Sequence, residues 1–167
     1  MKMCVTAKKI RTKQMFGLVL GVVLLGSLFG ILLGRKVNTQ SFQKPSFEKK
    51  AIPVEQVDTT DESYSMLQVA KDYQVGLCGQ PVQEGNNLII SFVNPKENKA
   101  WLQLFIYDEK HNLLGSSGVI KQGEGLQSIS LKQKLEPSET LNVQVAGYEP
   151  ETYYSIGEMN FQTCVRG

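Results

Sequence analysis

The sequence predicts an all-β protein: an antiparallel, immunoglobulin-like β-sandwich of about seven strands, preceded by one transmembrane helix and a flexible linker. An uncharged segment of twenty residues near the N-terminus has the length of a membrane-spanning helix. Further on, short runs rich in Val, Ile, Leu and aromatic residues are separated by Gly, Asn and Pro clusters, as in sandwiches and barrels. We expect a basic tail over 1–14, an anchor over 15–34, a linker over 35–65 and a β-domain over 66–167.

The uncharged segment is MFGLVLGVVLLGSLFGILLG, from Met15 to Gly34, and Ser27 is its one polar residue. Soluble helices are rarely apolar on every side, which disfavours a buried core helix. A cleaved signal peptide is the stronger alternative, but its apolar part is usually about 7–15 residues long and ends at a small-x-small site. Here no Ala occurs between Ala7 and Ala51, and no lipobox-like Cys follows. We expect a retained signal anchor.

Charge sets the expected orientation of this anchor. Five basic residues and no acidic residue precede it, whereas only Arg35 and Lys36 follow it closely. The positive-inside rule then places the N-terminus in the cytoplasm and the C-terminal domain outside the plasma membrane. Within the anchor, Gly26, Gly30 and Gly34 form two G-x-x-x-G motifs in series, which would let a second helix pack closely. A homo-oligomer through this helix is therefore an expected partner state.

The net charge of +2 conceals an uneven distribution. Seven of the 18 basic residues lie at or before Lys36, whereas all 16 acidic residues follow it, so the outer part carries a net charge of −5. Nucleic-acid binding depends largely on neutralising phosphates, so an acidic outer part without a basic patch argues against it.

Three cysteines are present, and two of them belong to the expected outer domain. Cys4 would lie in the reducing cytoplasm, whereas Cys78 and Cys164 would lie outside, where a disulfide can persist. These two lie near the first and last predicted strands. A bridge between them would stabilise the fold by about 2–4 kcal/mol. Two free thiols are the alternative, and both remain open.

The linker, residues 35–65, is polar, contains two prolines and lacks periodicity, so we expect a tether with a reach of about 30 Å. After it, alternation and turn signals predict seven strands. They are YQVGLCG (73–79), LIISFV (88–93), AWLQLFIY (100–107), LLGSSGVI (113–120), LQSISL (126–131), LNVQVAGY (141–148) and EMNFQTCV (158–165).

The strand AWLQLFIY carries apolar residues on both faces. Ala100, Leu102, Leu104 and Ile106 predict a core face, and the opposite face holds three aromatic residues, Trp101, Phe105 and Tyr107. An exposed apolar stripe often marks an interaction site, so these three are the candidate partner-binding residues. The alternative is a central strand that a loop or the linker covers.

We find no catalytic set, metal site or cofactor motif in the sequence, and expect the protein not to be an enzyme. His111 is the single histidine and lies in the turn DEKHN, where a solvated side chain is expected. Tyr148, Tyr153 and Tyr154 form a cluster that could stack on a sugar. They are the candidate residues for an alternative function as a carbohydrate- or cell-wall-binding module.

The stretch FVNPKENKAWLQLFIYDEKHNLLGSSGVIKQGEGLQSISLKQKL resembles small surface proteins encoded on Gram-positive conjugative elements, and the resemblance covers about 75 residues. Gln122-Gly123 replaces the Pro-Gly turn of that group, and Ser138 or Glu139 replaces a later glycine. The resemblance implies a cell-envelope protein, accessory to DNA transfer, whose Asn-Pro loop and Ser-Gly turn are scaffold elements. The matching positions are Phe92, Asn94, Pro95, Asn98, Ile106, Tyr107, Leu114, Ser117, Gly118, Ile120, Gly123, Leu131, Leu135 and Tyr148.

These inferences together predict a non-enzymatic, single-pass cell-surface protein. Its extracytoplasmic domain would bind another protein near the membrane, in a conjugation or secretion assembly.

Overall fold

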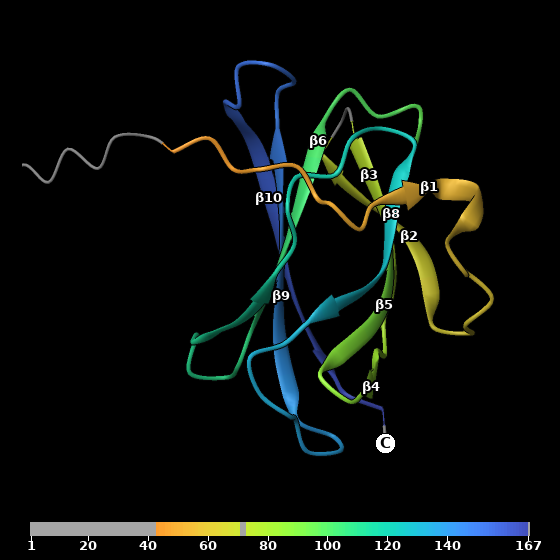
Figure 1. Cartoon of the computed structure of the whole chain (residues 1–167), viewed down its shortest axis with the longest axis vertical. Coiled ribbons are helices and arrows are strands. Elements are labelled where there is room, and N and C mark those ends of the chain that lie inside the picture. Colours follow the sequence, from red (N-terminus) through yellow and green to blue (C-terminus); the bar gives the residue numbers. More distant parts are fainter. Residues whose placement is uncertain (1–42, 71–72, 167) are drawn as a thin grey trace, which may run out of the picture. The chain divides into compact units, whose positions relative to one another are not determined.

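A computed structural model describes residues 43–70 and 73–166 (Figure 1). Within these ranges the chain is all-β with antiparallel sheets, as predicted, and its helical content is one three-residue 3₁₀ turn, η1 (Val54–Gln56). None of the helices in the described ranges has the length and apolar character that a membrane span requires. The predicted anchor over 15–34, with Gly26, Gly30 and Gly34, lies outside the described residues.

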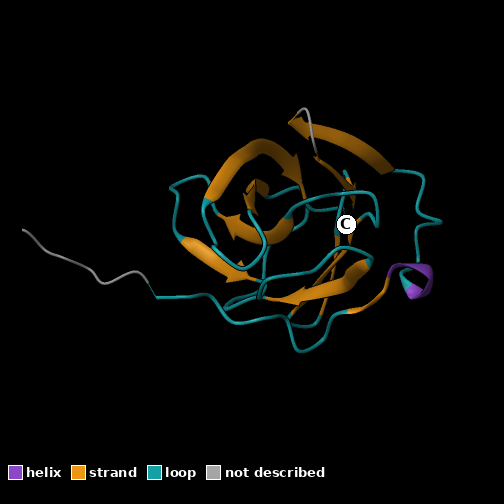
Figure 2. Cartoon of the chain, turned by 90° about the horizontal axis from the view of Figure 1, so that it is seen from above, coloured by secondary structure: helices purple, strands orange, loops and turns teal. Residues whose placement is uncertain are grey.

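The strands form two sheets that face one another across a shared core (Figure 2). The six-stranded sheet has the order β1 (Ile52–Pro53), β8 (Glu124–Ser130), β5 (Asn87–Asn94), β3 (Tyr73–Cys78) and β2 (Tyr64–Ala70), with β4 (Val82–Glu84) also paired to β5. The four-stranded sheet has the order β10 (Ser155–Cys164), β9 (Thr140–Tyr148), β6 (Trp101–Tyr107) and β7 (Leu113–Ser116).

Alternation of apolar and polar residues places the core. On β6, Leu102, Leu104 and Ile106 are fully buried, and on β9 so are Leu141 and Val145, as their spacing of two predicts. Burying a side chain of this size stabilises a fold by about 1.5–3 kcal/mol. The seven predicted strands are present as β3 and β5 to β10, so the period-two pattern identified every long strand except β2.

The predicted boundary of the domain is wrong. The compact unit begins at Gln43, so residues 43–65 belong to the domain and not to a linker. Figure 1 shows the first part of this segment as the orange trace that runs into β1. Ile52 and Pro53 pair with Gly125 and Glu124 of β8. The polar composition suggested a tether because this segment is held mainly by backbone and polar side-chain bonds, which leave no apolar periodicity in the sequence.

A buried pair of asparagines fixes the corner between the sheets. The Nδ2 group of Asn94 donates hydrogen bonds to the carbonyl oxygens of Ala100 and Ile120, both at 3.0 Å. Asn98 Nδ2 donates to the carbonyl of Gln74 at 2.6 Å, and Gln74 N donates to Asn98 Oδ1 at 2.9 Å. Buried amides satisfied in this way are favourable, and they tie β3, β5 and the start of β6 together.

Candidate binding surface

The outer face of β6 divides into a covered half and an open half. The backbone directs Trp101, Phe105 and Tyr107 to this face, as predicted, and all three are partly buried. Their surroundings differ, however. Trp101 lies against aromatic rings from two other segments, whereas Phe105 and Tyr107 lie beside a groove lined by amide side chains.

Trp101 belongs to an aromatic cluster with Phe47, Tyr148 and Tyr153, in which the ring of Tyr153 lies near the other three. The ring centroid of Trp101 lies 5.0 Å from that of Phe47 and 5.2 Å from that of Tyr153, both in edge-to-face geometry. Its Nε1 donates a hydrogen bond to Gln122 Oε1 at 3.1 Å. Edge-to-face pairs at these distances are favourable, so Trp101 is a packing residue here. The prediction of one continuous partner-binding stripe is therefore corrected at Trp101.

Phe47 is held in place by a strap, which we define as residues 43–57. Phe47 forms a parallel β-bridge with Val119. The backbone of Glu48 donates to the Val119 carbonyl at 2.9 Å, and Val119 N donates to the Ser46 carbonyl at 2.8 Å. Glu48 Oε2 also accepts a hydrogen bond from Gly118 N at 2.7 Å. A Cβ atom at Gly118 would lie only 2.5 Å from Glu48 N, so the strap approaches this closely because residue 118 is glycine.

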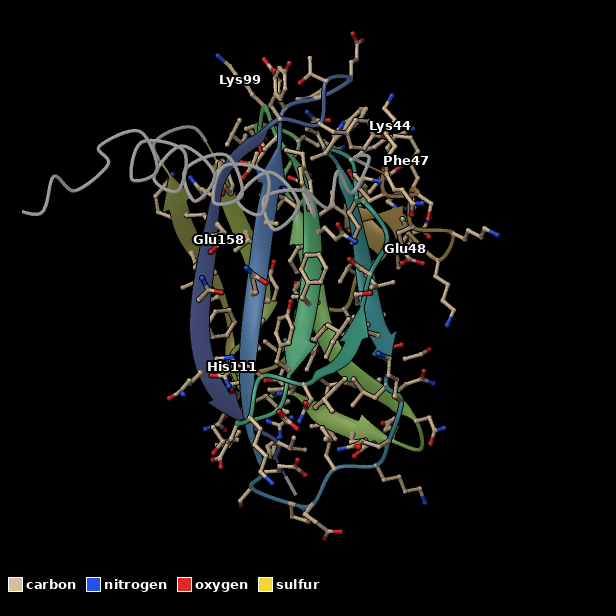
Figure 3. All side chains as sticks on the ribbon, turned by 90° about the vertical axis from the view of Figure 1, so that its left-hand side faces the viewer. Lys44, Phe47, Glu48, Lys99, His111 and Glu158 are labelled. Atoms are coloured by element: carbon tan, nitrogen blue, oxygen red, sulfur yellow. The ribbon has the colours of Figure 1, made fainter. Side chains whose placement is uncertain are left out.

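Two lysine ammonium groups lie over this cluster. The Nζ atom of Lys121 lies 4.4 Å from the Phe47 ring centroid, and that of Lys44 lies 4.7 Å from the Tyr153 ring centroid. Both distances allow a cation–π interaction. Figure 3 places Lys44, Phe47 and Glu48 at one end of the sandwich and His111 at the other.

The three tyrosines proposed as a sugar platform do not form one exposed surface. Tyr153 is 7% exposed and packs on Trp101, whereas Tyr154 is 73% exposed. Tyr148 is partly buried, and its hydroxyl donates to Gln103 Oε1 at 3.2 Å. Burial raises the pKa of this hydroxyl above its ordinary value. The positive φ angle of Tyr153, 60°, turns its ring inward while its neighbour points out.

The open half of the face contains a groove of about 300 Å³. Four of its lining residues are amides, and they form hydrogen bonds across and along the strands, two of them to the carboxylate of Glu158. Tyr107 donates to Gln144 Oε1 at 3.1 Å, and Gln162 Nε2 donates to Asn142 Oδ1 at 3.0 Å. We call it the amide groove. Its lining comprises Tyr107, His111, Asn142, Val143, Gln144, Asn160, Phe161 and Gln162.

His111 lies at the tip of the β6–β7 hairpin, as predicted. Its backbone N–H donates to the Asp108 carbonyl at 3.0 Å, and the side chain is exposed. Within the described residues, no acidic side chain bonds to its ring, and no group of three His, Cys, Asp or Glu side chains could hold a metal ion. The amide groove offers surface for contact and hydrogen bonds.

The cysteines Cys78 and Cys164 are both free thiols. Cys78 follows the inward-facing Leu77 on β3, so it faces the outer side of the six-stranded sheet. Cys164 pairs with Thr140 and faces the outer side of the four-stranded sheet. A disulfide needs Cβ atoms about 4 Å apart, and packed sheets are separated by about 10 Å. Of the two alternatives that the sequence left open, the structure has the free thiols.

Cys78 borders a second cavity, of about 360 Å³, on the outer side of the six-stranded sheet. Burial is the main reason that the pKa of its thiol is raised, so the thiol is protonated and unreactive. Nearby, Asp61 accepts hydrogen bonds from the side chain and backbone of Ser63 and pairs with Arg166. These bonds lower the pKa of Asp61 from 3.8 to about 2.

Sequence reasoning missed Phe47 and the amides of the groove as surface-forming residues. Phe47 carried one signal, a lone aromatic residue in an otherwise polar segment. The amides lie at the polar positions of the alternation on β9 and β10, but their grouping depends on which strands are neighbours. No family model, curated protein or solved structure matches the chain, so no family is assigned to it.

Proposed function

We propose that the protein is a non-enzymatic, single-pass membrane protein of the cell envelope whose extracytoplasmic domain binds another protein. The observation that carries this proposal is the open half of the four-stranded sheet. There, Phe105 and Tyr107 lie with their rings 6.4 Å apart beside the amide groove. Tyrosine and neutral amides are side chains that binding surfaces favour, because they offer contact area and hydrogen bonds without desolvating a charge.

The strand order supports the immunoglobulin-like part of the proposal. Strands β3, β5 and β8 take the places of A, B and E, and β6, β9 and β10 take those of C, F and G. Strand β7 then corresponds to C′. In such domains one sheet commonly provides a binding face, and here that face would be the outer side of the four-stranded sheet.

The position of the domain boundary bears on where the partner would lie. Only residues 35–42 separate the predicted anchor from the first described residue of the domain, Gln43. Eight residues span at most about 28 Å when fully extended. The proposed domain would therefore act close to the outer surface of the plasma membrane, with the N-terminus in the cytoplasm. Its partner would be another envelope protein. The resemblance to proteins of conjugative elements favours a component of a conjugation or secretion assembly.

The test is photocrosslinking in cells from position 107 of the full-length chain. We expect a discrete adduct with a different protein. The matched control carries the probe at Glu84, which is exposed on β4 of the other sheet. Equal adducts from both positions, or adducts from neither, would contradict a binding surface at Tyr107.

A carbohydrate- or cell-wall-binding module is the second candidate function, and the amide groove favours it. Amide groups can donate to and accept from sugar hydroxyls, and the Tyr107 ring could stack on a sugar. In this candidate function the sugar would bind at the amide groove, and not at Tyr148, Tyr153 and Tyr154 as the sequence suggested. Retention of the full-length chain on purified cell wall, lost in Tyr107→Ala and kept in Tyr154→Ala, would support it. Retention that is lost in Tyr154→Ala alone would exclude the groove.

A further inference from the structure

Strand β10 is the longest edge strand in the described part of the chain, longer than the seven-residue edge strand β2 of the other sheet. It has ten residues, is the outermost strand of the four-stranded sheet, and pairs with β9 on one side. No strand in the described part of the chain pairs with its other side. The other edge of this sheet, β7, has four residues, and β1 has two. A long edge strand presents backbone N–H and C=O groups that can pair with another strand.

The sequence of β10, SIGEMNFQTC, lacks the usual protection of an edge. Natural edge strands are commonly blocked by Lys, Pro, inward-pointing charges or bulges. Here Glu158 is the one charged residue, and the register with β9 shifts only between Ser155 and Gly157. From Glu158 to Cys164 the strand is regular. Its exposed positions alternate with the partly buried Met159, Phe161 and Thr163.

We infer that β10 is the contact through which two copies of this chain pair, as antiparallel strands centred on Asn160. In this register Asn160 lies opposite the same residue of the second copy. Glu158 then lies opposite Gln162, and Met159 opposite Phe161, so no like charges meet and apolar residues share one face. Centring the pair on Glu158 would place two carboxylates in contact. The two four-stranded sheets would become one continuous sheet of eight strands.

The C-terminal end of β10 restricts the register further. The hydroxyl of Thr163 bonds to the carbonyl of Gly79, and Arg166 forms a parallel bridge with Val82. Chain from the six-stranded sheet therefore lies beside this end of the strand. A centre at Gln162 or beyond would push the second copy into that chain. A register centred near Asn160 keeps the second copy clear of that chain.

Two observations favour a second copy over an unrelated strand. Pairing about Asn160 places Glu158, the one charged residue of β10, opposite the neutral Gln162 of the second copy, so two identical strands can pair without a like-charge contact. Independently, the predicted anchor carries the series Gly26, Gly30, Gly34, a motif of helix pairing. The two-fold axis of an antiparallel strand pair is normal to the sheet, so both domains would present their outer faces in the same direction. The strand contact does not require the proposed partner at Tyr107.

The first test is disulfide crosslinking of the full-length chain in membranes. The native cysteines are replaced (Cys4→Ser, Cys78→Ala, Cys164→Ser) and a single cysteine is introduced by Asn160→Cys. With a mild oxidant we expect a crosslinked dimer at several times the yield of the matched variant Ser65→Cys. Ser65 is exposed on β2, the edge of the other sheet. Equal yields from the two variants would overturn the proposal.

The second test examines the register and separates it from helix association. Two differently tagged chains, Glu158→Cys and Gln162→Cys, should crosslink to each other more than Glu158→Cys does to itself. Adding Asn160→Lys to both chains should abolish this mixed product, whereas Asn160→Gln should keep it. The substitutions Gly26→Leu, Gly30→Leu and Gly34→Leu in the predicted anchor should leave the preference for the 158–162 pair unchanged. A mixed product that is insensitive to Asn160→Lys would overturn the strand contact, whatever the adducts at position 107.

Discussion

The two ends of strand β6 carry aromatic side chains on the same face, yet one end is covered and the other is open. Trp101 lies under Phe47 and Tyr153, with its Nε1 bonded to Gln122. Tyr107, six residues along the same strand, bonds to Gln144 at the edge of the amide groove. Both halves follow the same alternation, so the strand itself does not distinguish them.

The difference shows that segments remote in sequence determine whether an outer-face side chain is covered or exposed. Phe47 comes from the strap, and Tyr153 comes from the β9–β10 loop. Each covers Trp101 because hydrogen bonds elsewhere, at Val119 and at Glu149, fix its backbone. No comparable segment reaches Tyr107 in the described part of the chain.

The largest effect is expected for Trp101→Ala. Removing a fully buried Trp costs about 3–5 kcal/mol, so this partly buried one should lower the free energy of unfolding by about 2–3 kcal/mol. Trp101 is the only tryptophan, so unfolding of the full-length chain in detergent should be followed by circular dichroism. A loss of unfolding free energy below about 0.5 kcal/mol is typical of an ordinary surface substitution. It would mean that Trp101 contributes as an exposed residue and not as a packed one.

The next effect is expected for Phe47→Ala, at about 1–2 kcal/mol, because its ring is 40% exposed. The more informative quantity is the coupling with Trp101→Ala. If the two rings stabilise each other, the double variant should lose less than the sum of the single losses, by about 0.5–1.5 kcal/mol. Additive losses would mean that the strap is held by its backbone bonds alone.

Tyr107→Ala should impair partner binding while changing stability little. We expect a loss of stability below about 1 kcal/mol, because the ring borders a groove rather than the core. Capture of the partner should nevertheless be abolished, as measured by recovery of the adduct from a probe at position 105. Phe47→Ala is the control, and it should retain capture. Equal loss of capture in both variants would indicate that unfolding, not contact, is the cause.

A smaller effect is expected for Lys121→Gln, which removes the ammonium group over Phe47. An exposed cation–π contact is worth about 0.5–1 kcal/mol. The matched control is Lys134→Gln, an exposed lysine of the β8–β9 connection. Because Phe47 is the ring involved, the loss should disappear in a Phe47→Ala background. If it persists there, Lys121 acts through some other group.

The smallest effect is expected at the outer side of the other sheet, from Asp61→Asn. The pKa of Asp61 is lowered to about 2 in the folded chain, from 3.8. A carboxyl with a lowered pKa stabilises the fold above its ordinary pKa and loses that contribution as the pH falls towards 2. The unfolding midpoint of the wild type should therefore fall more steeply between pH 4 and 2 than that of Asp61→Asn. This loss should add to that of Trp101→Ala, since the sites share no partner.

The sequence predicted those parts of the fold that depend on local alternation. Leu102, Leu104 and Ile106 identified the core face of β6, and Leu141, Val143 and Val145 that of β9. Strands β1 and β4 were missed because two or three residues cannot display a period of two. Strand β2 was missed because its start falls in a polar segment that reads as a linker.

The candidate site was predicted in part. Alternation correctly directed Trp101 and Tyr107 to the outer face, but it could not reveal that Phe47 would cover one of them. The tyrosine cluster failed for a different reason. Consecutive residues, Tyr153 and Tyr154, point in opposite directions, and proximity in sequence does not place two rings on one surface.

The strap has a mechanical consequence. Tension transmitted along the chain from its N-terminal side enters the domain at Gln43 and reaches residues 43–51 of the strap before either sheet. It meets first the two backbone bonds at Val119 and the ring of Phe47, and only then the short pairing of β1 with β8. Antiparallel ladders far longer than these hold β9, β6 and β10 together. A pull would therefore peel the strap from the surface and expose the side of Trp101 that Phe47 covers, while Tyr153 and the rest of the sandwich stay in place.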